Sequence, residues 1–323
     1  MLNNKKILVT GATGFIGSNL VRRLVAENHE VHIFSRQTSN RWRLAGLLNK
    51  INDHLVDIND KEKVRLTVQE IKPDIIFHLA TFSFFRGIDF SQSEEEIIKT
   101  NLFSTMNLIN ACGSCKYDAF INTGTSSEYG PCLAPMKENQ ICRPQTAYAV
   151  SKCATVKYIY CYVKNNNKPI ITIRPFSPFG LFDDIKRMIP EVIINALQNK
   201  PITVKNPTAV RDYIYIDDLV DAYLKTAELA GQHQGEVFNV GSGVQHTIKE
   251  VAEKIVSIAG SQSIINIDPQ PLNLNESPVW QADISKVKQA LNWQPKYNFE
   301  DGLVKTIDWF KNNLSLYQKN DGK

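Results

Sequence analysis

Tyr148 and Lys152 are two residues whose types and spacing could move a proton. They are four positions apart at the start of a helical pattern, so on a helix they share one face, one turn apart. An unperturbed tyrosine titrates near pH ~10, but a neighbouring ammonium group favours the phenolate and brings its pKa towards the working range. The pair could therefore exchange a proton with an alcohol or a ketone. The alternative is a surface tyrosine beside a solvated lysine.

A hydroxyl-rich segment precedes this pair. The apolar strand expected at residues 118–123 runs into Thr125, Ser126 and Ser127. Ligands bind outside the carboxyl ends of the strands in open α/β sheets. A hydroxyl of this segment could therefore donate a hydrogen bond to a substrate oxygen while Tyr148 exchanges its proton.

Three glycines near the N-terminus predict a dinucleotide site. They follow an apolar strand at residues 5–10 and lead into an amphipathic helix at 15–27, which is the context that such a motif requires. Gly11 would begin a tight turn, Gly14 would let the backbone approach a pyrophosphate, and Gly17 would let the helix pack closely on the strand. The amino end of the helix would face the phosphates.

The end of the second expected strand, residues 30–35, indicates which dinucleotide is bound. Many dinucleotide folds place a carboxylate there to bind the ribose 2′-hydroxyl, whereas this chain reads Ser35-Arg36, with Arg41 close behind. A planar guanidinium suits a 2′-phosphate, so the sequence favours NADP(H) over NAD(H). The alternative is that Arg36 is a solvated loop charge.

Strands and helices alternate up to residue 175, which predicts an α/β fold of the Rossmann type, a doubly wound parallel sheet. The pattern then breaks into shorter pieces punctuated by proline. We expect a dinucleotide-binding domain of residues 1–175 plus 213–240. Residues 176–212 plus 241–323 would form a smaller C-terminal substrate lobe.

Composition limits the class of protein. The chain has 323 residues, 43% of them apolar, and a net charge of +4 without a basic block, which does not argue for nucleic acid. No apolar run is long enough to span a membrane or to act as a signal peptide, so we expect a cytoplasmic protein. The six cysteines show no second pair at metal-ligand spacing, so we expect free thiols and no metal site.

Taken together, these motifs resemble the extended short-chain dehydrogenase/reductases, in the nucleotide-sugar epimerase/dehydratase/reductase group. The resemblance covers nearly the whole chain. The matching segments are Gly11 to Gly17, Asp57-Ile58, His78-Leu79-Ala80, Asn101, Thr125 to Gly130, Tyr148 with Lys152, Ile173-Arg174-Pro175, Arg211 to Asp218 and Phe238 to Gly241.

The resemblance implies roles for individual residues. Thr125 would be the catalytic hydroxyl beside Tyr148 and Lys152, and the last two would also contact the cofactor. The other expected cofactor contacts are Gly11, Thr13, Gly14, Phe15, Ile16, Gly17, Ser35, Arg36, Arg41, Asp57, Ile58, Leu79, Ala80, Thr81, Asn101 and Pro175. The expected substrate contacts are Phe82, Ser126, Ser127, Ser177 and Arg211, the last through a substrate phosphate.

Several reactions fit these residues. Ser35-Arg36 favours an NADPH-dependent reductase of an NDP-4-keto-deoxyhexose, in which Tyr148 protonates the oxygen at C4. A 4-epimerase would use the same residues with retained cofactor. A 4,6-dehydratase needs a further carboxylate beside the threonine, where this chain has Ser127, with Glu128 adjacent. A dinucleotide-sensing scaffold would need no catalytic residues at all.

Two further expectations follow from the resemblance. The aromatic segment 82–92 should overhang the sugar, unless its phenylalanines simply pack a loop. Helices at 93–112 and 146–165 could build the four-helix bundle of a homodimer, unless their apolar faces only pack on the sheet.

Overall fold

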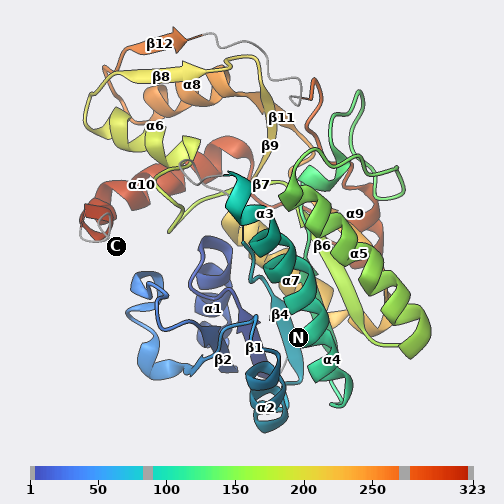
Figure 1. Ribbon diagram of the computed structural model, residues 1–323. Helices are drawn as coiled ribbons and strands as arrows, with labels where there is room; N and C mark the ends of the chain where they lie inside the picture. The colour runs from blue at the N-terminus through green and yellow to red at the C-terminus, as the bar shows by residue number, and fades with distance from the viewer. Residues whose placement is uncertain (1–3, 83–89, 269–276, 319–323) are drawn as a thin grey trace. The chain divides into compact units, whose positions relative to one another are not determined.

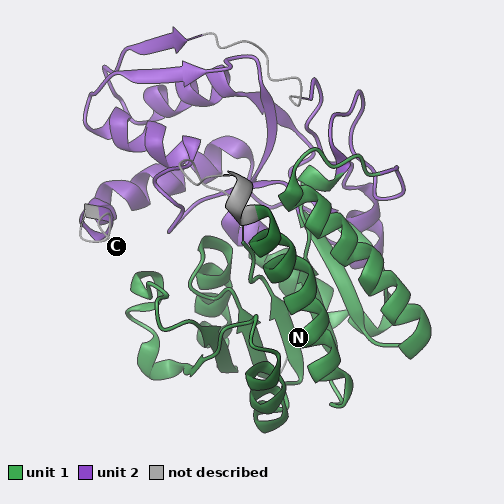
Figure 2. Ribbon diagram, viewed as in Figure 1, with its two compact units in different colours: residues 1–128, 142–174, 220–238 green, residues 129–141, 175–219, 239–323 purple. Residues whose placement is uncertain are grey.

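The computed structural model describes residues 4–82, 90–268 and 277–318. The chain divides into two compact units, shown in Figure 2. Unit 1 comprises residues 1–128, 142–174 and 220–238, and unit 2 comprises residues 129–141, 175–219 and 239–323. Each unit is therefore assembled from segments that are distant in the sequence.

A seven-stranded sheet organises unit 1 (Figure 1). Its strand order is β10-β6-β5-β4-β1-β2-β3, and every pairing from β3 across to β6 is parallel. Apart from β10 this is the order 3-2-1-4-5-6 of dinucleotide-binding folds, which confirms the predicted fold class. The strands are β1 (Lys6–Thr10), β2 (Glu30–Ser35), β3 (Asn52–Leu55), β4 (Ile75–His78), β5 (Ala119–Thr123), β6 (Ile170–Pro175) and β10 (Val237–Val240).

The central strands are unbroken apolar runs because helices cover both faces of the sheet. On one face α2 (Lys61–Ile71), α4 (Ser104–Gly113) and α5 (Ala147–Asn166) share a core with the strands that includes Val68, Leu108 and Ile159. On the other face α1 (Phe15–Ala26) and α7 (Ile216–Glu228) are joined by an ion pair, Arg23 Nη1 to Asp221 Oδ1 at 2.6 Å.

One predicted helix differs from the structure. Residues 93–112, expected as a single helix, contain α3 (Phe90–Ile98), a π-helical turn (Lys99–Phe103) and α4. The apolar periodicity continues through the turn, so periodicity alone could not reveal the extra residue. The amino end of α5 is capped by the Thr146 hydroxyl, which accepts the Ala149 N–H at 3.1 Å. This cap fixes Tyr148 in the first turn of the helix.

Unit 2 contains two small sheets. A three-stranded sheet has the order β11-β9-β7, and β12 pairs with β8 in parallel. The strands are β7 (Ser177–Phe179), β8 (Ile202–Lys205), β9 (Val210–Tyr215), β11 (Gln245–Thr247) and β12 (Ile265–Asp268). The helices are α6 (Met188–Leu197), α8 (Ile248–Ile258), α9 (Ser285–Leu291) and α10 (Phe299–Gln318). In this sheet β9 pairs with β7 and β11. The predicted domain boundary at residue 213 would have assigned the last residues of β9 to the dinucleotide-binding domain.

In the described part of the chain, no helix has both the length and the apolarity needed to cross a membrane.

Close packing of the glycine loop leads to a first prediction. A Cβ at Gly17 would lie 2.2 Å from the carbonyl oxygen of Gly11 and 2.9 Å from the Cα of Ala12, and backbone atoms cannot move aside as a flexible side chain can. We expect Gly17→Ala to lower the free energy of unfolding by about 1–3 kcal/mol, measured by urea denaturation. Gly46→Ala is the control because nothing lies within 4 Å of its Cβ position. Equal stability of the two variants would contradict this packing.

Candidate active site

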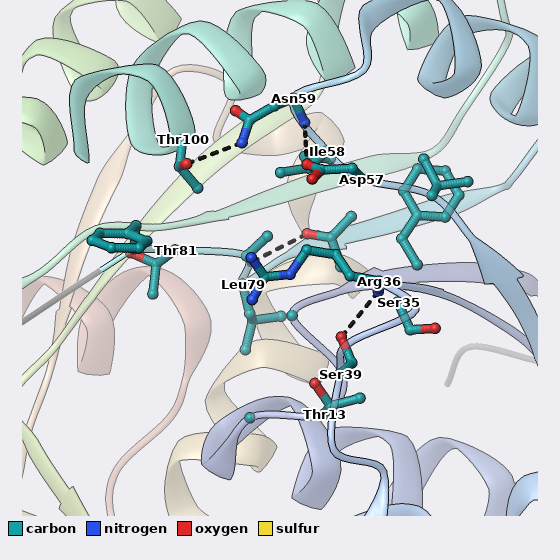
Figure 3. Close-up of a pocket in the computed structure, with 17 residues that line it drawn as sticks. Thr13, Ser35, Arg36, Ser39, Asp57, Ile58, Asn59, Leu79, Thr81 and Thr100 are labelled. Atoms are coloured by element: carbon teal, nitrogen blue, oxygen red, sulfur yellow. Dashed lines mark hydrogen bonds between the residues drawn. The ribbon is translucent and has the colours of Figure 1, made fainter. Parts of the chain in front are cut away.

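A pocket of about 230 Å³ opens at the carboxyl ends of β1, β2 and β4 (Figure 3). This is the point at which the strand order reverses, where ligands bind in open α/β sheets. Its lining comes entirely from unit 1. The lining residues are Thr10, Gly11, Thr13, Gly14, Phe34, Ser35, Arg36, Ser39, Val56, Asp57, Ile58, Asn59, Leu79, Ala80, Thr81, Phe82 and Thr100.

Gly11 and Gly14 form part of the floor of this pocket, and neither position has a side chain. Gly11 has φ +69°, and a Cβ there would lie 2.5 Å from the carbonyl carbon of Leu79. At Gly14, the N-cap of α1, no side chain caps the helix. Its amino end is therefore available to an anion, which fits the pyrophosphate of a dinucleotide. Of the other expected contacts in this motif, Thr13 lines the pocket, whereas Phe15, Ile16 and Gly17 lie within α1.

The carboxyl end of β2 holds a charge that sequence reasoning missed. Asp53 of β3 accepts a hydrogen bond from the Ser35 hydroxyl at 2.5 Å. A carboxylate therefore does lie beside the strand end, supplied by the neighbouring strand. Arg41 neutralises it, with its Nε 2.7 Å from Asp53 Oδ2 and its Nη2 2.6 Å from the Ser35 hydroxyl. Arg36 and Ser39 line the pocket, whereas Arg41 does not.

The far wall of the pocket is made by the loop after β3. Asp57 and Ile58, both expected cofactor contacts, line it together with Asn59 and Thr100, which were not expected. The Asp57 carboxylate accepts the Asn59 N–H at 2.9 Å, and the Asn59 amide donates to the Thr100 hydroxyl at 3.2 Å (Figure 3). These bonds fix the loop, because each side chain that faces the pocket is also tied to a neighbour.

A buried ion pair fixes the backbone of Thr125, the residue that carries the expected catalytic hydroxyl. Glu128 and Arg174 lie 2.7 Å apart with side chains 0% and 4% exposed. The other oxygen of Glu128 accepts the backbone N–H of Thr125 at 2.9 Å. Thr125 comes directly before a short 3-10 turn, residues 126–129. The shape of this turn depends on the carboxylate of Glu128, which lies within it. Ser126 and Ser127 lie in the same turn, and the Ser127 N–H donates to the Thr125 hydroxyl at 3.2 Å.

Tyr148 reaches this hydroxyl. The side chains of Thr125 and Thr81 lie close enough to its phenol to lower the pKa of Tyr148. Burial nevertheless raises the pKa of Tyr148 to about 12, and the nearby Thr125 side chain lowers it only in part. The structure therefore brings Tyr148 and Thr125 together, but it gives the phenol little acidity of its own.

Lys152 does not lower the tyrosine pKa in the way the spacing suggested. Its ammonium group donates to the carbonyl oxygen of Thr123 at 2.9 Å, and burial lowers the pKa of Lys152 to about 8. The side chain is buried, with 3% of its surface exposed, and the nearby carboxylate of Glu128 favours its charge. Burial therefore outweighs the expected stabilisation of the phenolate by an ammonium group.

Asn101 ties three parts of unit 1 together from the π-helical turn. Its amide oxygen accepts from the Thr81 hydroxyl at 3.0 Å and from the Phe82 N–H at 2.8 Å. Its amide nitrogen donates to the Ser151 hydroxyl at 3.0 Å, on the residue before Lys152. Asn101 was expected to contact the cofactor; here it connects the pocket loop after β4 to α5.

The remaining expected residues divide between the pocket and unit 2. Leu79, Ala80, Thr81 and Phe82 line the pocket. Pro175, Ser177 and Arg211 belong to unit 2, where the Arg211 guanidinium stacks on the Trp280 ring at 4.8 Å and donates to the Val210 carbonyl at 2.7 Å. Most of the aromatic segment expected over the sugar, residues 83–89, lies outside the described residues.

Comparison with known proteins places this geometry among sugar-nucleotide enzymes. The model of the "NAD dependent epimerase/dehydratase family" matches residues 7–241. The UDP-glucose 4-epimerase of Mycolicibacterium smegmatis is 30% identical, covering 95% of this chain and 99% of that protein. The dTDP-D-glucose 4,6-dehydratase of Bos taurus is 26% identical over 96% of this chain and 90% of its own length.

A solved structure supports the same placement. The UDP-glucuronic acid 4-epimerase from Bacillus cereus, in complex with UDP-glucuronic acid and NAD, is 28% identical with a TM-score of 0.83. The match covers 95% of this chain and 99% of that one. The likeness thus extends over both units.

The Glu128–Arg174 pair yields the second prediction. Glu128→Gln keeps the shape of the side chain but leaves a buried guanidinium without its counter-charge. We expect a loss of about 3 kcal/mol in the free energy of unfolding, measured by urea denaturation. Glu62→Gln is the matched control, because the ion pair between Glu62 and Arg65 is exposed and should contribute no measurable stability. A Glu128→Gln variant as stable as the control would show that the pair does not hold this turn.

Proposed function

The chain belongs to the NAD-dependent epimerase/dehydratase family, and we propose that it interconverts an alcohol and a ketone at C4 of a nucleotide-bound hexose, as a 4-epimerase. The observation that carries this proposal is that the Thr125 side chain lies close enough to the Tyr148 phenol to act on its pKa, with Lys152 one helical turn away. Two adjacent hydroxyls can hold one substrate oxygen, and one of them can take or return its proton.

Each residue of this group has a distinct task in the proposed reaction. Tyr148 exchanges the proton of the C4 oxygen. Thr125 donates a hydrogen bond to the same oxygen and keeps it in place. Lys152, whose ammonium group donates to the Thr123 carbonyl, positions α5 against the end of β5 and so holds Tyr148 near Thr125. A bound nicotinamide dinucleotide would supply the hydride acceptor and donor.

The pocket residues fit such a cofactor. Gly11 leaves room where any Cβ would clash with the backbone after β4, and the uncapped amino end of α1 suits a pyrophosphate. Asp57 and Ile58 would bind the adenosine end, and Thr81 and Phe82 lie at the other end of the lining. The protein contributes position and charge, while the redox chemistry belongs to the cofactor.

The surroundings of Glu128 argue against a 4,6-dehydration, another reaction that the sequence left open. That reaction requires a carboxylate that removes a proton from the sugar. Glu128 is the carboxylate nearest Thr125 in sequence, but both of its oxygens are engaged, one by Thr125 and one by Arg174. A base that is 0% exposed and paired with a guanidinium does not reach a substrate carbon.

The second candidate is an NADPH-dependent 4-keto reductase, and one observation favours it. Arg36 and Ser39 line the pocket beside Gly14, where the 2′-phosphate of NADP(H) would lie. The neighbouring carboxylate, Asp53, is neutralised by Arg41, so it does not repel that phosphate. The reductase would use Tyr148, Thr125 and Lys152 unchanged.

We also propose that the protein is a homodimer through α3, α4 and α5. These helices contact one another, and the segment carries exposed apolar side chains at Phe103, Val150 and Tyr160. Apolar side chains that stay exposed on helices already packed on a sheet are suited to burial against the same face of a second copy of the protein.

Removal of the Tyr148 hydroxyl tests the mechanism. Tyr148→Phe should lower kcat by about 10²–10⁴-fold, because general acid–base catalysis is lost, while cofactor affinity changes little. Turnover of UDP-sugars and other NDP-hexoses, and cofactor binding by fluorescence, are the measurements. Tyr297→Phe is the control, since Tyr297 is partly exposed and belongs to unit 2, outside the proposed catalytic group and the proposed dimer helices. Unchanged turnover in Tyr148→Phe would refute the mechanism, and a scaffold that only senses dinucleotide would show no turnover in either protein.

The cofactor distinguishes the two candidate reactions. A 4-epimerase should carry NAD(H) through purification, detected by mass spectrometry of the released nucleotide. In a reductase, Arg36→Ala should weaken NADPH binding by about 10-fold or more through loss of a charge-assisted hydrogen bond, and leave NADH binding unchanged. Retained NAD together with no effect of Arg36→Ala would remove the reductase from consideration.

A further inference from the structure

Two cysteines lie together next to the expected catalytic residues. The sulfur atoms of Cys142 and Cys153 and a carboxylate oxygen of Glu128 all lie within 4.8 Å of one another. Both thiols are free and only partly buried. Cys142 lies in the loop before α5, and Cys153 follows Lys152 directly in that helix. All of these residues belong to unit 1.

Two thiols and a carboxylate at this spacing could suggest a metal site, but a cation already occupies the position. Arg174 Nη2 lies 2.7 Å from Glu128 Oε2 and donates to the Cys142 sulfur at 3.4 Å. A divalent ion would have to displace this buried guanidinium and leave it without a counter-charge, which is costly. The geometry therefore suits a reaction between the two sulfurs better than it suits a metal.

We propose that Cys142 and Cys153 form an oxidant-responsive dithiol whose disulfide reversibly inactivates the catalytic site. The oxidant would be a small disulfide or a peroxide. With a disulfide, one Cys sulfur attacks it and releases the first thiol, and the second Cys sulfur then closes the intramolecular bond and releases the other. Two protein S–H bonds are lost, one protein S–S bond forms, and the small disulfide is reduced to two thiols.

The order of attack follows from the surroundings of each sulfur. Burial, together with nearby Cys142 and Glu128, raises the pKa of Cys153 to about 11, so Cys153 is a poor first nucleophile. The Cys142 sulfur has the Arg174 guanidinium beside it. Cys142 is therefore the attacking residue, and Cys153 resolves the mixed disulfide.

Closure of this bond would disturb two groups of the proposed active site. A disulfide holds its sulfurs about 2.05 Å apart, so the two cysteine side chains must shift from their present contacts with Arg174 and Glu128 for the bond to close. Cys153 is covalently next to Lys152. Arg174, which contacts Cys142, orients the Glu128 carboxylate that holds the Thr125 N–H. A shift of about 1 Å in such groups can cost about 100-fold in rate.

The experiment exposes the full-length protein, with its retained cofactor, to oxidised glutathione and measures two properties. Peptide mapping under non-reducing conditions should find a Cys142–Cys153 cross-link and an intact mass lower by two hydrogen atoms. Turnover should fall by about 100-fold and return with dithiothreitol. The covalent step stands independently of the proposed function, whereas the loss of turnover rests on it, so failure of one is distinguishable from failure of the other.

Matched variants identify the residues responsible. Cys142→Ser should keep full turnover in oxidised glutathione, whereas Cys153→Ser should show no cross-link and instead accumulate a glutathione mixed disulfide on Cys142. Cys153→Ala serves if the serine variant fails to fold. Cys161→Ser should remain as sensitive as the unmodified protein, because Cys161 is exposed and outside the cluster. Absence of the cross-link, a cross-linked protein with full turnover, or a tightly bound metal ion in the reduced protein would each overturn the proposal.

Discussion

The ion pair between Glu128 and Arg174 is the interaction on which the expected catalytic geometry depends. It is buried, so both charges have lost their water, and each must be satisfied by protein atoms. Glu128 does this by accepting the Thr125 N–H and the Arg174 guanidinium. As a result, the 3-10 turn that follows Thr125 is fixed to β6 at the residue where that strand nears its end. In the sequence Glu128 resembles a catalytic base, but in the structure its carboxylate holds the turn that follows Thr125.

The same low-polarity surroundings explain why Tyr148 and Lys152 differ from a simple acid–base pair. Burial favours the neutral form of both, raising the pKa of Tyr148 to about 12 and lowering that of Lys152 to about 8. The neighbouring Thr125 side chain favours the phenolate, but only in part. The protein thus fixes the position of the Tyr148 phenol but does little to lower its pKa. A bound oxidised nicotinamide would supply further positive charge, which favours the phenolate form of Tyr148.

Much of the fold could be predicted because the signals are local. Apolar runs and alternating helices predicted the six strands of the parallel sheet, and the glycine spacing predicted the turn before α1. The missing details arise from contacts between distant segments. The π-helical turn around Asn101 has no signature in the periodicity. Asp53 reaches the end of β2 only because β3 pairs with β2 in parallel register, Ile33 with Asp53. The role of Glu128 appears only when Arg174 is beside it.

The end of β2 shows how charge balance, and not a single residue type, determines which cofactor fits. Sequence reasoning counted Arg36 and Arg41 as two cations and found no carboxylate. In the structure Asp53 cancels Arg41, and the Ser35 hydroxyl bridges the two. The remaining positive charge at the pocket wall is that of Arg36. A 2′-phosphate would meet one guanidinium there, whereas a 2′-hydroxyl would find Asp53 paired with Arg41 and outside the pocket lining. NAD(H) retained by this chain would therefore be held mainly by the pyrophosphate and by the loops around Asp57 and Leu79, away from the ribose.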